Sequence, residues 1–382
     1  MRADGPVVAA DFGLGAKVAF LRRPDAYPGR TAAVTSRETH MSWVFLVGDR
    51  VYKLKKPVRF PYLDYSTIER REAACRAELE LNRRLAPGVY LDVVPLTASA
   101  DGLTIGGTGA VADWLVVMRR LRDDLMLDNA LQAGAVGHGE LQRLADTLVH
   151  FYRHARPIPA SPEAHLREWR RRIDRNRVTL ADPRFGLPAI AVARIDRIQR
   201  CFVGQAADLL RERALARRIV EGHGDLRPEH VVLSEPISVI DCIEFNRSFL
   251  AVDPFDELAF LEVECERLGF AGKGRYLAGQ VARGLHDGVP DALFSFYRCY
   301  HATVRARLAA AHLLEPEIGS PDGWRDLSHQ YLALAATGAT VLDAFLAARR
   351  RRPRRCLELD QAFGCQSTGY SGGRESKKAR RR

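Results

Sequence analysis

Residues 221–246 have the sequence EGHGDLRPEHVVLSEPISVIDCIEFN, and the rest of the chain is interpreted around this stretch. Two short apolar runs, Val231–Leu233 and Ser238–Cys242, are separated by a turn that contains proline. Two such runs joined by a few polar or proline residues predict a β-hairpin. Asp225 precedes the first run and Asp241 lies within the second. A hairpin of this size would bring the two carboxylates to the same edge of the fold.

Two carboxylates in this arrangement suit metal-assisted phosphoryl transfer. One would accept the proton of an attacking hydroxyl, and the other would hold Mg²⁺ against the phosphates of a nucleotide. His223, Gly224 and Asp225 alone are a weak signal, because a tight turn can use an Asp as a cap and a His for packing. The strand, turn and Val-Ile-Asp that follow favour the catalytic interpretation.

Length and composition limit the class of protein. A chain of 382 residues, 47% of them hydrophobic, is long enough for about two lobes. Its seven cysteines include no C-x-x-C pair, which predicts a reduced, cytoplasmic chain without structural zinc. The N-terminal residues contain no signal-peptide core, and no run of about eighteen apolar residues is present, so we expect no membrane partner.

The positive charge is concentrated at the C-terminus. Residues 349–382 carry +9 of the net charge of +11, which leaves the rest of the chain almost neutral. This segment lacks apolar periodicity, and its composition predicts a disordered basic tail. Nucleic-acid binding is therefore not expected, except through the tail.

The first third of the chain predicts a small sheet with one main helix. Strands are expected at Ser42–Val47 and Val51–Lys55, joined by a turn, which places Lys53 and Lys55 on one face. A helix is expected over residues 66–86, begun by a capping box of Ser66 and Glu69. Further strands are expected at 91–96, 103–105 and 114–118.

From Asp128 onward the apolar spacing becomes helical. Helices are expected around 140–155, 161–180, 190–220, 288–313 and 324–350, with another that begins near Glu257. The arginine-rich faces of the helices at 161–180 and 190–220 are most simply solvated, although they could instead bind an acidic substrate or partner.

Several motifs resemble the aminoglycoside phosphotransferase family of the protein-kinase-like superfamily. That family has H-G-D followed by a strand with I-D, as at residues 223–225 and 240–241 here. One subgroup, sometimes fused to a P-loop ATPase domain, also has E-T-H-x-S-W-V-F-L, Y-K-x-K-K-P-V, L-N-R-R-L-A-P-x-x-Y-L-D-V-V-P and I-E-F-N. These strings begin here at Glu38, Tyr52, Leu81 and Ile243. The resemblance covers about residues 35–345.

The resemblance implies an α+β fold of the protein-kinase-like, two-lobe type. A small antiparallel-sheet N-lobe with one main helix would precede a larger, mostly helical C-lobe. The expected domains are a leader (1–30), an N-lobe that binds nucleotide (31–120), a helical C-lobe with the catalytic loop (121–348) and the basic tail (349–382).

The resemblance also implies roles in the C-lobe. Asp225 would be the catalytic base, His223 would pack beneath the loop and fix its backbone, and Arg227 would approach substrate or phosphate. Asp241 would bind Mg²⁺. His230 stands where the family has an Asn metal ligand. Because imidazole suits Mn²⁺ better than Mg²⁺, His230 would bind a second metal poorly or favour Mn²⁺, or would hydrogen-bond Asp225 instead.

Two further acids follow the hairpin in a D-P-x-x-D-L-A-like element. Asp253 would cap a helix, and Asp256 would bond to the backbone of the catalytic loop. Glu244, just past Asp241, is a further candidate oxygen ligand for the metal.

In the N-lobe, the resemblance implies residues that hold ATP. Lys53 would grip the phosphates, with Lys55 as the close alternative, and Glu78 would pair with this lysine, with Glu72 as the second candidate. The usual glycine-rich loop is absent, so Ser42 and nearby hydroxyl residues would have to cradle the phosphates. Val117 and Met118, with Arg119, would line the adenine.

The expected function is ATP-dependent transfer of the γ-phosphate to a hydroxyl of a small-molecule substrate, with ATP and Mg²⁺ as cofactors. The alternative is a nucleotide-binding pseudokinase with a regulatory role, which His230 and the missing glycine loop favour. Polycationic aminoglycosides are less attractive as acceptors than a neutral or anionic metabolite, because arginine-rich helices are expected around the cleft. A protein substrate stays open.

Overall fold

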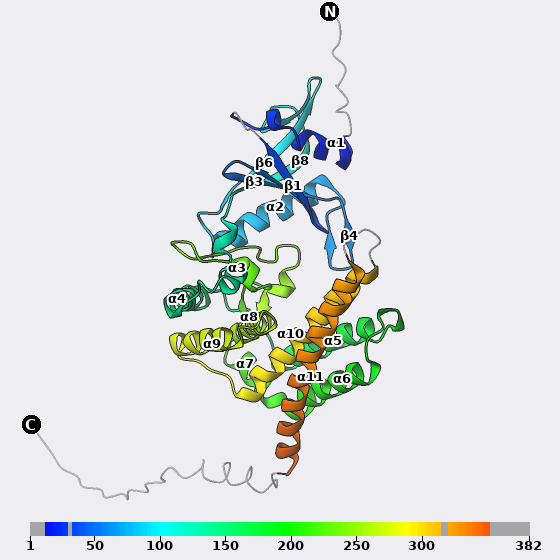
Figure 1. Cartoon of the computed structure of the whole chain (residues 1–382), viewed down its shortest axis with the longest axis vertical. Helices are drawn as coiled ribbons and strands as arrows, with labels where there is room; N and C mark the ends of the chain where they lie inside the picture. The colour runs from blue at the N-terminus through cyan, green and yellow to red at the C-terminus, as the bar shows by residue number, and fades with distance from the viewer. Residues whose placement is uncertain (1–11, 30–32, 315–319, 352–382) are drawn as a thin grey trace, which may run out of the picture.

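The computed structural model describes residues 12–29, 33–314 and 320–351 of the chain (Figure 1). An antiparallel sheet and its helices form a small N-lobe, and a larger helical C-lobe lies below it. The expectation of a two-lobe, protein-kinase-like α+β fold is confirmed. The predicted tail beyond residue 351 lies outside the described residues.

The N-lobe sheet has the strand order β1-β2-β3-β8-β6-β7, with every neighbouring pair antiparallel. Its strands are β1 (Val34–Glu38), β2 (Ser42–Val47), β3 (Arg50–Lys55), β6 (Tyr90–Ser99), β7 (Gly102–Ile105) and β8 (Ala110–Arg119). The predicted hairpin of β2 and β3 is confirmed, and its turn uses Gly48 at a φ of +57°. The predicted strands at 91–96, 103–105 and 114–118 are also confirmed, whereas β1 was not expected.

Helix α1 (Leu14–Leu21) covers one face of the sheet. Val18 and Leu21 are buried against a cluster that includes Phe45 and Leu115. This helix falls within the segment that the sequence suggested only as a leader. Its Lys17 is buried and donates to the Asp113 carboxylate of β8 at 2.9 Å, so a charge pair adds to the apolar contact.

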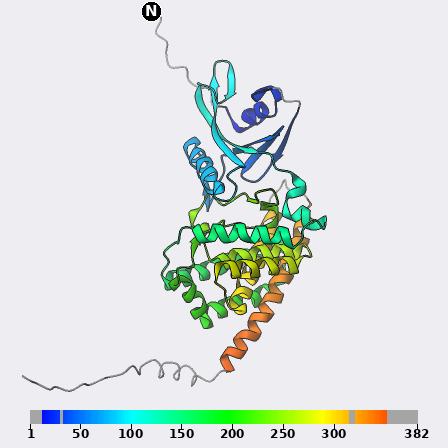
Figure 2. The same ribbon diagram turned by 90° about the vertical axis from the view of Figure 1, so that its left-hand side faces the viewer.

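Helix α2 (Ile68–Arg83) covers the opposite face, and Figure 2 shows the sheet between the two helices. The predicted capping box is wrong. Thr67 is the N-cap, and its hydroxyl accepts from the N–H of Arg70 at 3.3 Å. Ser66 instead donates to the Asp64 carboxylate at 2.6 Å, because the preceding hairpin places that acid beside it. That hairpin, of β4 (Arg59–Phe60) and β5 (Leu63–Asp64), was also not expected.

The C-lobe is helical from residue 123 onward, apart from short strands. Its α-helices are α3 (Leu127–Gln132), α4 (His138–His154), α5 (Pro162–Leu180), α6 (Ala189–Gln205), α7 (Ala207–Leu215), α8 (Pro254–Arg267), α9 (Ala271–Leu285), α10 (Asp291–Ala311) and α11 (Pro321–Arg351). Short helical turns of the C-lobe lie at η2 (Asp123–Leu125), η3 (Pro183–Phe185), η4 (Pro228–His230), η5 (Arg247–Leu250) and η6 (His312–Leu314). A further turn, η1 (Pro24–Ala26), follows α1 in the N-lobe.

Most of the predicted helices are confirmed, with two differences. The single helix expected over 190–220 is two helices, α6 and α7, which break at Ala206. Helix α9 was missed, since its four glycines are poor helix formers. Trp169 of α5 is fully buried at the centre of the lobe and contacts the rings of Phe296, Tyr297 and Tyr300.

Helix α11 differs from expectation in its hydropathy. Of the described helices, it alone is long and apolar enough to cross a membrane by length and composition, with a best-window mean hydropathy of 1.6. The sequence had suggested no such stretch, and the alanines of α11 supply it. One side of α11 packs on α10 and α6, where Tyr331, Ala335 and Leu342 are fully buried, as expected for a core helix.

The predicted hairpin after the HGD sequence is present but short. Strand β10 (Val231–Val232) pairs with β11 (Ser238–Val239), and β9 (Val220–Glu221) pairs with β12 (Ala251–Val252). Asp241 was expected inside the second strand, which is wrong. It lies two residues beyond β11 with a φ of +61°, a conformation that no strand residue adopts.

Side chains at the C-terminal end of α2 form hydrogen bonds with the C-lobe. Arg84 donates to the carbonyl oxygens of Glu221 and Gly222 at 2.9 and 2.8 Å. The Asn82 side chain accepts from the N–H of Cys242 at 2.9 Å. These bonds fix α2 against the segment that carries Asp241.

Candidate active site

The HGD loop, residues 222–230, is held from beneath by Glu257 of α8. The backbone N–H groups of His223 and Gly224 both donate to the Glu257 carboxylate, the former at 2.8 Å. The hydroxyl of Tyr152 on α4 donates to the same carboxylate at 2.8 Å. Burial raises the pKa of the Glu257 carboxyl despite these donors. The backbone of the loop is therefore fixed by one buried acid.

The acid that braces the loop differs from the predicted one. Asp256 was expected to bond to the loop backbone, which is wrong, because its carboxylate accepts from Arg172 at 3.5 Å and His301 at 2.7 Å. Adjacent residues of an α-helix point about 100° apart, so only one of residues 256 and 257 faces the loop. The prediction for Asp253 is confirmed, since its side chain caps the first turn of α8.

Two glycines allow the loop to approach its support. A Cβ at Gly222 would lie 2.3 Å from the Val252 side chain and 2.7 Å from the Glu257 carboxylate, too close for any other residue. Gly224 has a φ of +88° and packs against Ile243. The glycine of the HGD sequence is thus needed for conformation as well as for space.

His223 lies buried beneath the loop, in the position that its expected packing role requires. Its Nε2 is 2.9 Å from the carbonyl oxygen of Ile240, which can only accept, so Nε2 carries the proton. Its Nδ1 is then free to accept from the N–H of Asp225 at 3.3 Å. Burial lowers the pKa of His223 to about 4, which keeps this imidazole neutral. His223 therefore orients Asp225 through the backbone.

His230 lies between the two acids. Its Nδ1 donates to the backbone carbonyl of Asp225 at 2.8 Å and is 3.6 Å from the carboxylate of the same residue. Its Nε2 is 3.7 Å from Oδ2 of Asp241. The expected convergence of the two acids is confirmed, since one imidazole contacts both.

The donor set around His230 fits a divalent cation. Because Nδ1 bonds to a carbonyl, Nε2 is left as the position that a proton or a metal ion can occupy, the usual orientation of a ligating His. Asp241 contributes a half-exposed carboxylate on the far side. No cluster of three or more His, Cys, Asp or Glu close enough to hold a metal occurs in the described ranges. Mg²⁺ bound with nucleotide typically needs only one or two carboxylates.

Arg227 lies beside the predicted base. Its guanidinium is 3.7 Å from the Asp225 carboxylate and also contacts Glu229. The side chain is mostly buried, and its Nε has no hydrogen-bond partner in the described part of the chain. This position is compatible with the expected approach to substrate or phosphate, which stays a prediction.

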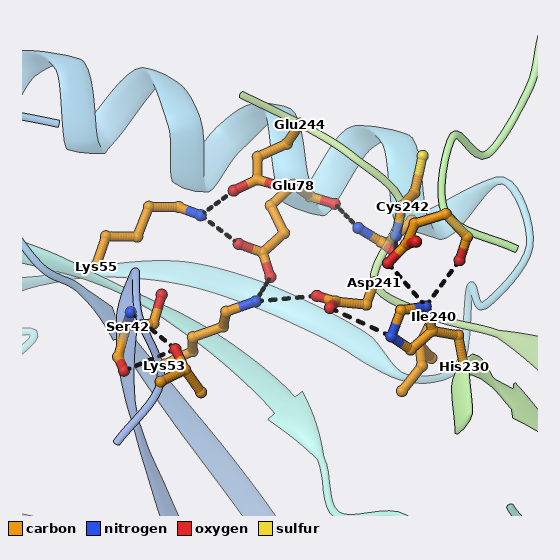
Figure 3. Close-up of polar contacts among 12 residues, drawn as sticks. Ser42, Lys53, Lys55, Glu78, His230, Ile240, Asp241, Cys242 and Glu244 are labelled. Atoms are coloured by element: carbon orange, nitrogen blue, oxygen red, sulfur yellow. Dashed lines mark hydrogen bonds and ion pairs between the residues drawn. The ribbon is translucent and has the colours of Figure 1, made fainter. Parts of the chain in front are cut away.

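Both lysines of β3 contact the predicted glutamate of α2 (Figure 3). Lys53 Nζ is 2.8 Å from Oε1 of Glu78 and 3.1 Å from Oδ1 of Asp241. Lys55 Nζ is 2.6 Å from Oε2 of Glu78. Burial would raise the pKa of Glu78, and the two ammonium groups outweigh it. The Lys53 ammonium holds the pKa of Asp241 well below its ordinary value. The alternative Glu72 faces the surface and pairs with Arg76.

Glu244 does not face the metal position. Its carboxylate is 2.5 Å from Lys55 Nζ and accepts from the Tyr65 hydroxyl at 2.5 Å, as Figure 3 shows for the lysine. The suggestion that Glu244 adds an oxygen ligand is therefore wrong, because the buried ammonium of Lys55 has already paired with it. Tyr90, which sequence reasoning missed, accepts a hydrogen bond at its hydroxyl oxygen from the N–H of Asp241 at 3.1 Å. The conspicuous Y-L-D-V-V-P string was the available signal.

The loop between β1 and β2 takes the place of a glycine-rich loop. The N–H of Ser42 donates to the Thr39 hydroxyl at 3.0 Å, and the Thr39 N–H donates back to the Ser42 carbonyl at 2.8 Å. The amide of Ser42 is thus occupied and the residue is buried, so its predicted contact with phosphate stays a prediction. At the tip, His40 stacks on His312 of the C-lobe with ring centroids 4.6 Å apart.

The two residues predicted to line adenine lie on opposite faces of β8. Met118 packs in the cluster on the α2 side, with Ile240, and so shares a face with Lys53. Val117 packs in the cluster on the α1 side, because adjacent strand residues point to opposite faces. The side chain of Val117 is therefore directed away from the lysines, and its predicted contact can involve only the backbone.

Comparisons with known proteins agree with this architecture. The chain is 34% identical over 302 residues to uncharacterised proteins of Mycobacterium tuberculosis and Mycobacterium bovis, an overlap of 76% of this chain. It spans only 57% of the length of those relatives. No family model matches the chain.

Among solved structures, a choline/ethanolamine kinase family protein from Mesorhizobium loti is similar to this chain with a TM-score of 0.51. The match covers 87% of this chain and 98% of that one, at 16% sequence identity, and so concerns the fold. The match shows the two-lobe, kinase-like fold, and the identity to the mycobacterial proteins places the chain in one family with them.

Proposed function

We propose that the protein is an ATP-dependent phosphotransferase that moves the γ-phosphate of ATP to a hydroxyl of a small molecule. The observation that carries this proposal is the contact of Lys53 with both Glu78 and Asp241, with Asp225 on the other side of His230. In this arrangement one carboxylate can act as the base, the other can bind the metal, and the lysine can bind the phosphates, which are the charged groups that phosphoryl transfer needs.

The N-lobe residues hold the nucleotide. Lys53 lies on the more exposed side of the ion network, and its ammonium group would bond to the phosphates. Glu78 orients Lys53 from a buried position. Met118 lies on the same face of the sheet and would contact the adenine. Asp241, aided by His230, would hold Mg²⁺ or Mn²⁺, which when bound neutralises charge on the phosphates.

The C-lobe residues serve the acceptor. Asp225 orients the acceptor hydroxyl and takes its proton as the oxygen–phosphorus bond forms and the bond between the β- and γ-phosphates breaks. ADP leaves with the electron pair of that bond, and Asp225 returns the proton to solvent. A general base of this kind typically contributes about 10²- to 10⁴-fold to the rate. Neutral His223 and Glu257 keep the carboxylate of Asp225 in place through the loop backbone.

The test is nucleotide binding and ATP turnover by the purified protein with Mg²⁺ and Mn²⁺ in parallel. Asp225→Asn is expected to retain nucleotide binding and to lose turnover by about 10²- to 10⁴-fold. Asp241→Asn is expected to weaken metal-dependent nucleotide binding as well. Asp146→Asn, an exposed acid on α4 that bonds only to Gln142, is the matched control. Nucleotide binding without turnover in either metal would favour the pseudokinase alternative, and no nucleotide binding would refute both.

A further inference from the structure

Arg307 on α10 is a cation without a matching anion. Its Nε donates to Oδ1 of Asn176 on α5 at 2.9 Å, and its side chain is partly buried. No carboxylate of the described residues lies within ion-pair distance of it. The other arginines that α10 directs into the lobe are paired, Arg298 with Glu266 and Arg305 with Glu264. A cation removed from water is normally paired, so an unpaired one indicates a binding site.

The surroundings of Arg307 increase this excess of positive charge. Burial lowers the pKa of the Arg307 guanidinium, and the nearby charge of Arg175 lowers it further, against the effect of Tyr300 and Tyr62. Arg175 lies one residue before Asn176 on α5, and its guanidinium is half exposed. It shares the single Glu168 carboxylate with Arg171 and Arg172. An anion that bound here would relieve the repulsion between the two guanidinium groups.

An aromatic row borders the two arginines. The ring centroids of Tyr62 and Phe245 are 5.9 Å apart, and those of Phe245 and Phe249 are 6.1 Å apart. The Arg175 guanidinium lies 5.8 Å from the Phe249 centroid. Tyr62 belongs to the turn of the β4–β5 hairpin, which Figure 1 shows directed from the N-lobe toward the C-lobe. Both lobes therefore contribute to the Arg307 cluster, which we define as Arg175, Arg307, Tyr62, Phe245 and Phe249.

The Arg307 cluster lies next to the proposed reaction centre. Phe245 directly follows Glu244, which belongs to the ion network of Lys55. Ile243, two residues before Phe245, donates its N–H to the carbonyl oxygen of His223 at 3.1 Å, so the segment that carries Phe245 lies against the HGD loop.

We propose that the acceptor is a hydroxylated small molecule with an anionic group, a carboxylate or a phosphate, which Arg307 and Arg175 bind while its hydroxyl lies at Asp225. This inference rests on the proposed function and names its substrate class. With Nε occupied by Asn176, the two Nη groups of Arg307 form a fork of donors that matches the paired oxygens of such a group. A polycationic acceptor would be repelled.

The experiment uses pairs of polyols that differ only in charge. Glycerol, xylitol and sorbitol are compared with glycerate, xylonate and gluconate, and sorbitol 6-phosphate supplies the phosphate group. For wild-type protein we expect kcat/KM to be at least about tenfold higher for the acid than for its neutral partner, as one charge-assisted hydrogen bond of 1.5–3 kcal/mol implies. In Arg307→Gln this ratio is expected to fall toward one, and in Arg307→Lys only part of it is lost.

Arg211→Gln is the matched control, because Arg211 is a partly exposed arginine of α7 that pairs with Glu163, and neither residue belongs to the Arg307 cluster. It removes the same charge and should keep the acid-to-neutral ratio. Equal use of acids and neutral polyols by wild-type protein, or an unchanged ratio in Arg307→Gln, would overturn the proposal. Higher activity with the carboxylates than with sorbitol 6-phosphate would assign the anion as a carboxylate, and the reverse as a phosphate.

A binding measurement separates this proposal from the proposed function. Calorimetric titration of gluconate and of inorganic phosphate into the full chain needs no turnover. Binding that is lost in Arg307→Gln and kept in Arg211→Gln supports the anion site even if no ATP is consumed, in which case only the proposed function fails. Nucleotide binding and turnover of neutral polyols, with no binding of either anion, would refute the anion site and leave the phosphotransferase intact.

Discussion

Two lysines of β3 contact the same glutamate and yet have different surroundings. Lys53 is 17% exposed, and its second partner, Asp241, is 49% exposed. Lys55 is 1% exposed, and its second partner, Glu244, is 9% exposed. Lys53 and Asp241 form the open half of this ion network, and we expect them to exchange their mutual contact for contacts with phosphate and metal. Lys55 and Glu244 form the closed half, which is buried and cannot make this exchange. The comparison predicts that Lys53 serves the proposed chemistry and that Lys55, on the same strand, serves stability.

The largest expected effect comes from the closed half. Lys55→Met leaves the buried carboxylates of Glu78 and Glu244 without their shared cation, and breaking a buried pair in this way costs about 3–5 kcal/mol. Urea denaturation should show this loss in the free energy of unfolding. Adding Glu244→Gln to Lys55→Met should restore part of it. A loss below about 1 kcal/mol would mean that Lys55 is not structural.

The open half should behave in the opposite way. Lys53→Met is expected to lower ATP turnover by about 10²- to 10³-fold, the cost of one preorganised donor to transition-state charge. Its effect on the free energy of unfolding should be smaller than that of Lys55→Met, because Lys53 and Asp241 are accessible to water. Turnover and urea denaturation of the two variants, measured side by side, check the comparison. Equal losses of stability would remove the distinction.

A smaller effect is expected beneath the HGD loop. Tyr152→Phe removes one donor from the buried Glu257 carboxylate and should cost about 1.5–3 kcal/mol of stability. Because Glu257 also holds the loop backbone, turnover should fall without a change in nucleotide affinity. Tyr276→Phe on α9 is the control, since the Tyr276 ring packs against the core and His138 while its hydroxyl has no hydrogen bond to the described residues. A change in nucleotide affinity would contradict this placement.

The smallest effect at neutral pH comes from His223. Its pKa in the folded protein is about 4, below the ordinary value of 6.5, so the folded state binds fewer protons than the unfolded state between these values. The corresponding stability is present above pH 6.5 and is lost as the pH falls toward 4, at about 1.4 kcal/mol for each unit of pKa shift. His165, with the same shift, contributes in the same direction. The difference in pH dependence of unfolding between His165→Gln and the double variant His165→Gln/His223→Gln gives the part due to His223.

The sequence predicted the parts of the site that depend on strand alternation and helix spacing. Lys53 and Lys55 are two residues apart and therefore share one face of a regular strand. Glu78 lies on the buried face of a regular helix. Both patterns follow from local geometry. The acid that holds the loop backbone was predicted as Asp256, whereas it is the next residue, Glu257. The rotation of a helix about its axis is set by packing, so the sequence pattern did not determine which of the two faces the loop.

Other features arise from contacts between distant segments. Asp241, which has a positive φ, donates its N–H to Tyr90 and accepts at its carboxylate from Lys53, residues that are 151 and 188 positions away in sequence. The brief strands β4 and β5 have no periodic pattern, and their residues form a hairpin only between the two lobes. The isolation of Arg307 is likewise a property of three dimensions, since nearby acids in sequence do not predict which cation stays unpaired.

The bonds at the end of α2 also bear on control of the proposed activity. Many kinase-like proteins are switched by displacing the helix that carries the glutamate partner of the lysine. Here such a displacement would separate Arg84 from Gly222 and Asn82 from Cys242, at about 1–3 kcal/mol for each buried group left unpaired. These bonds favour the assembled site, so we expect the output of the proposed activity to follow the supply of nucleotide and acceptor.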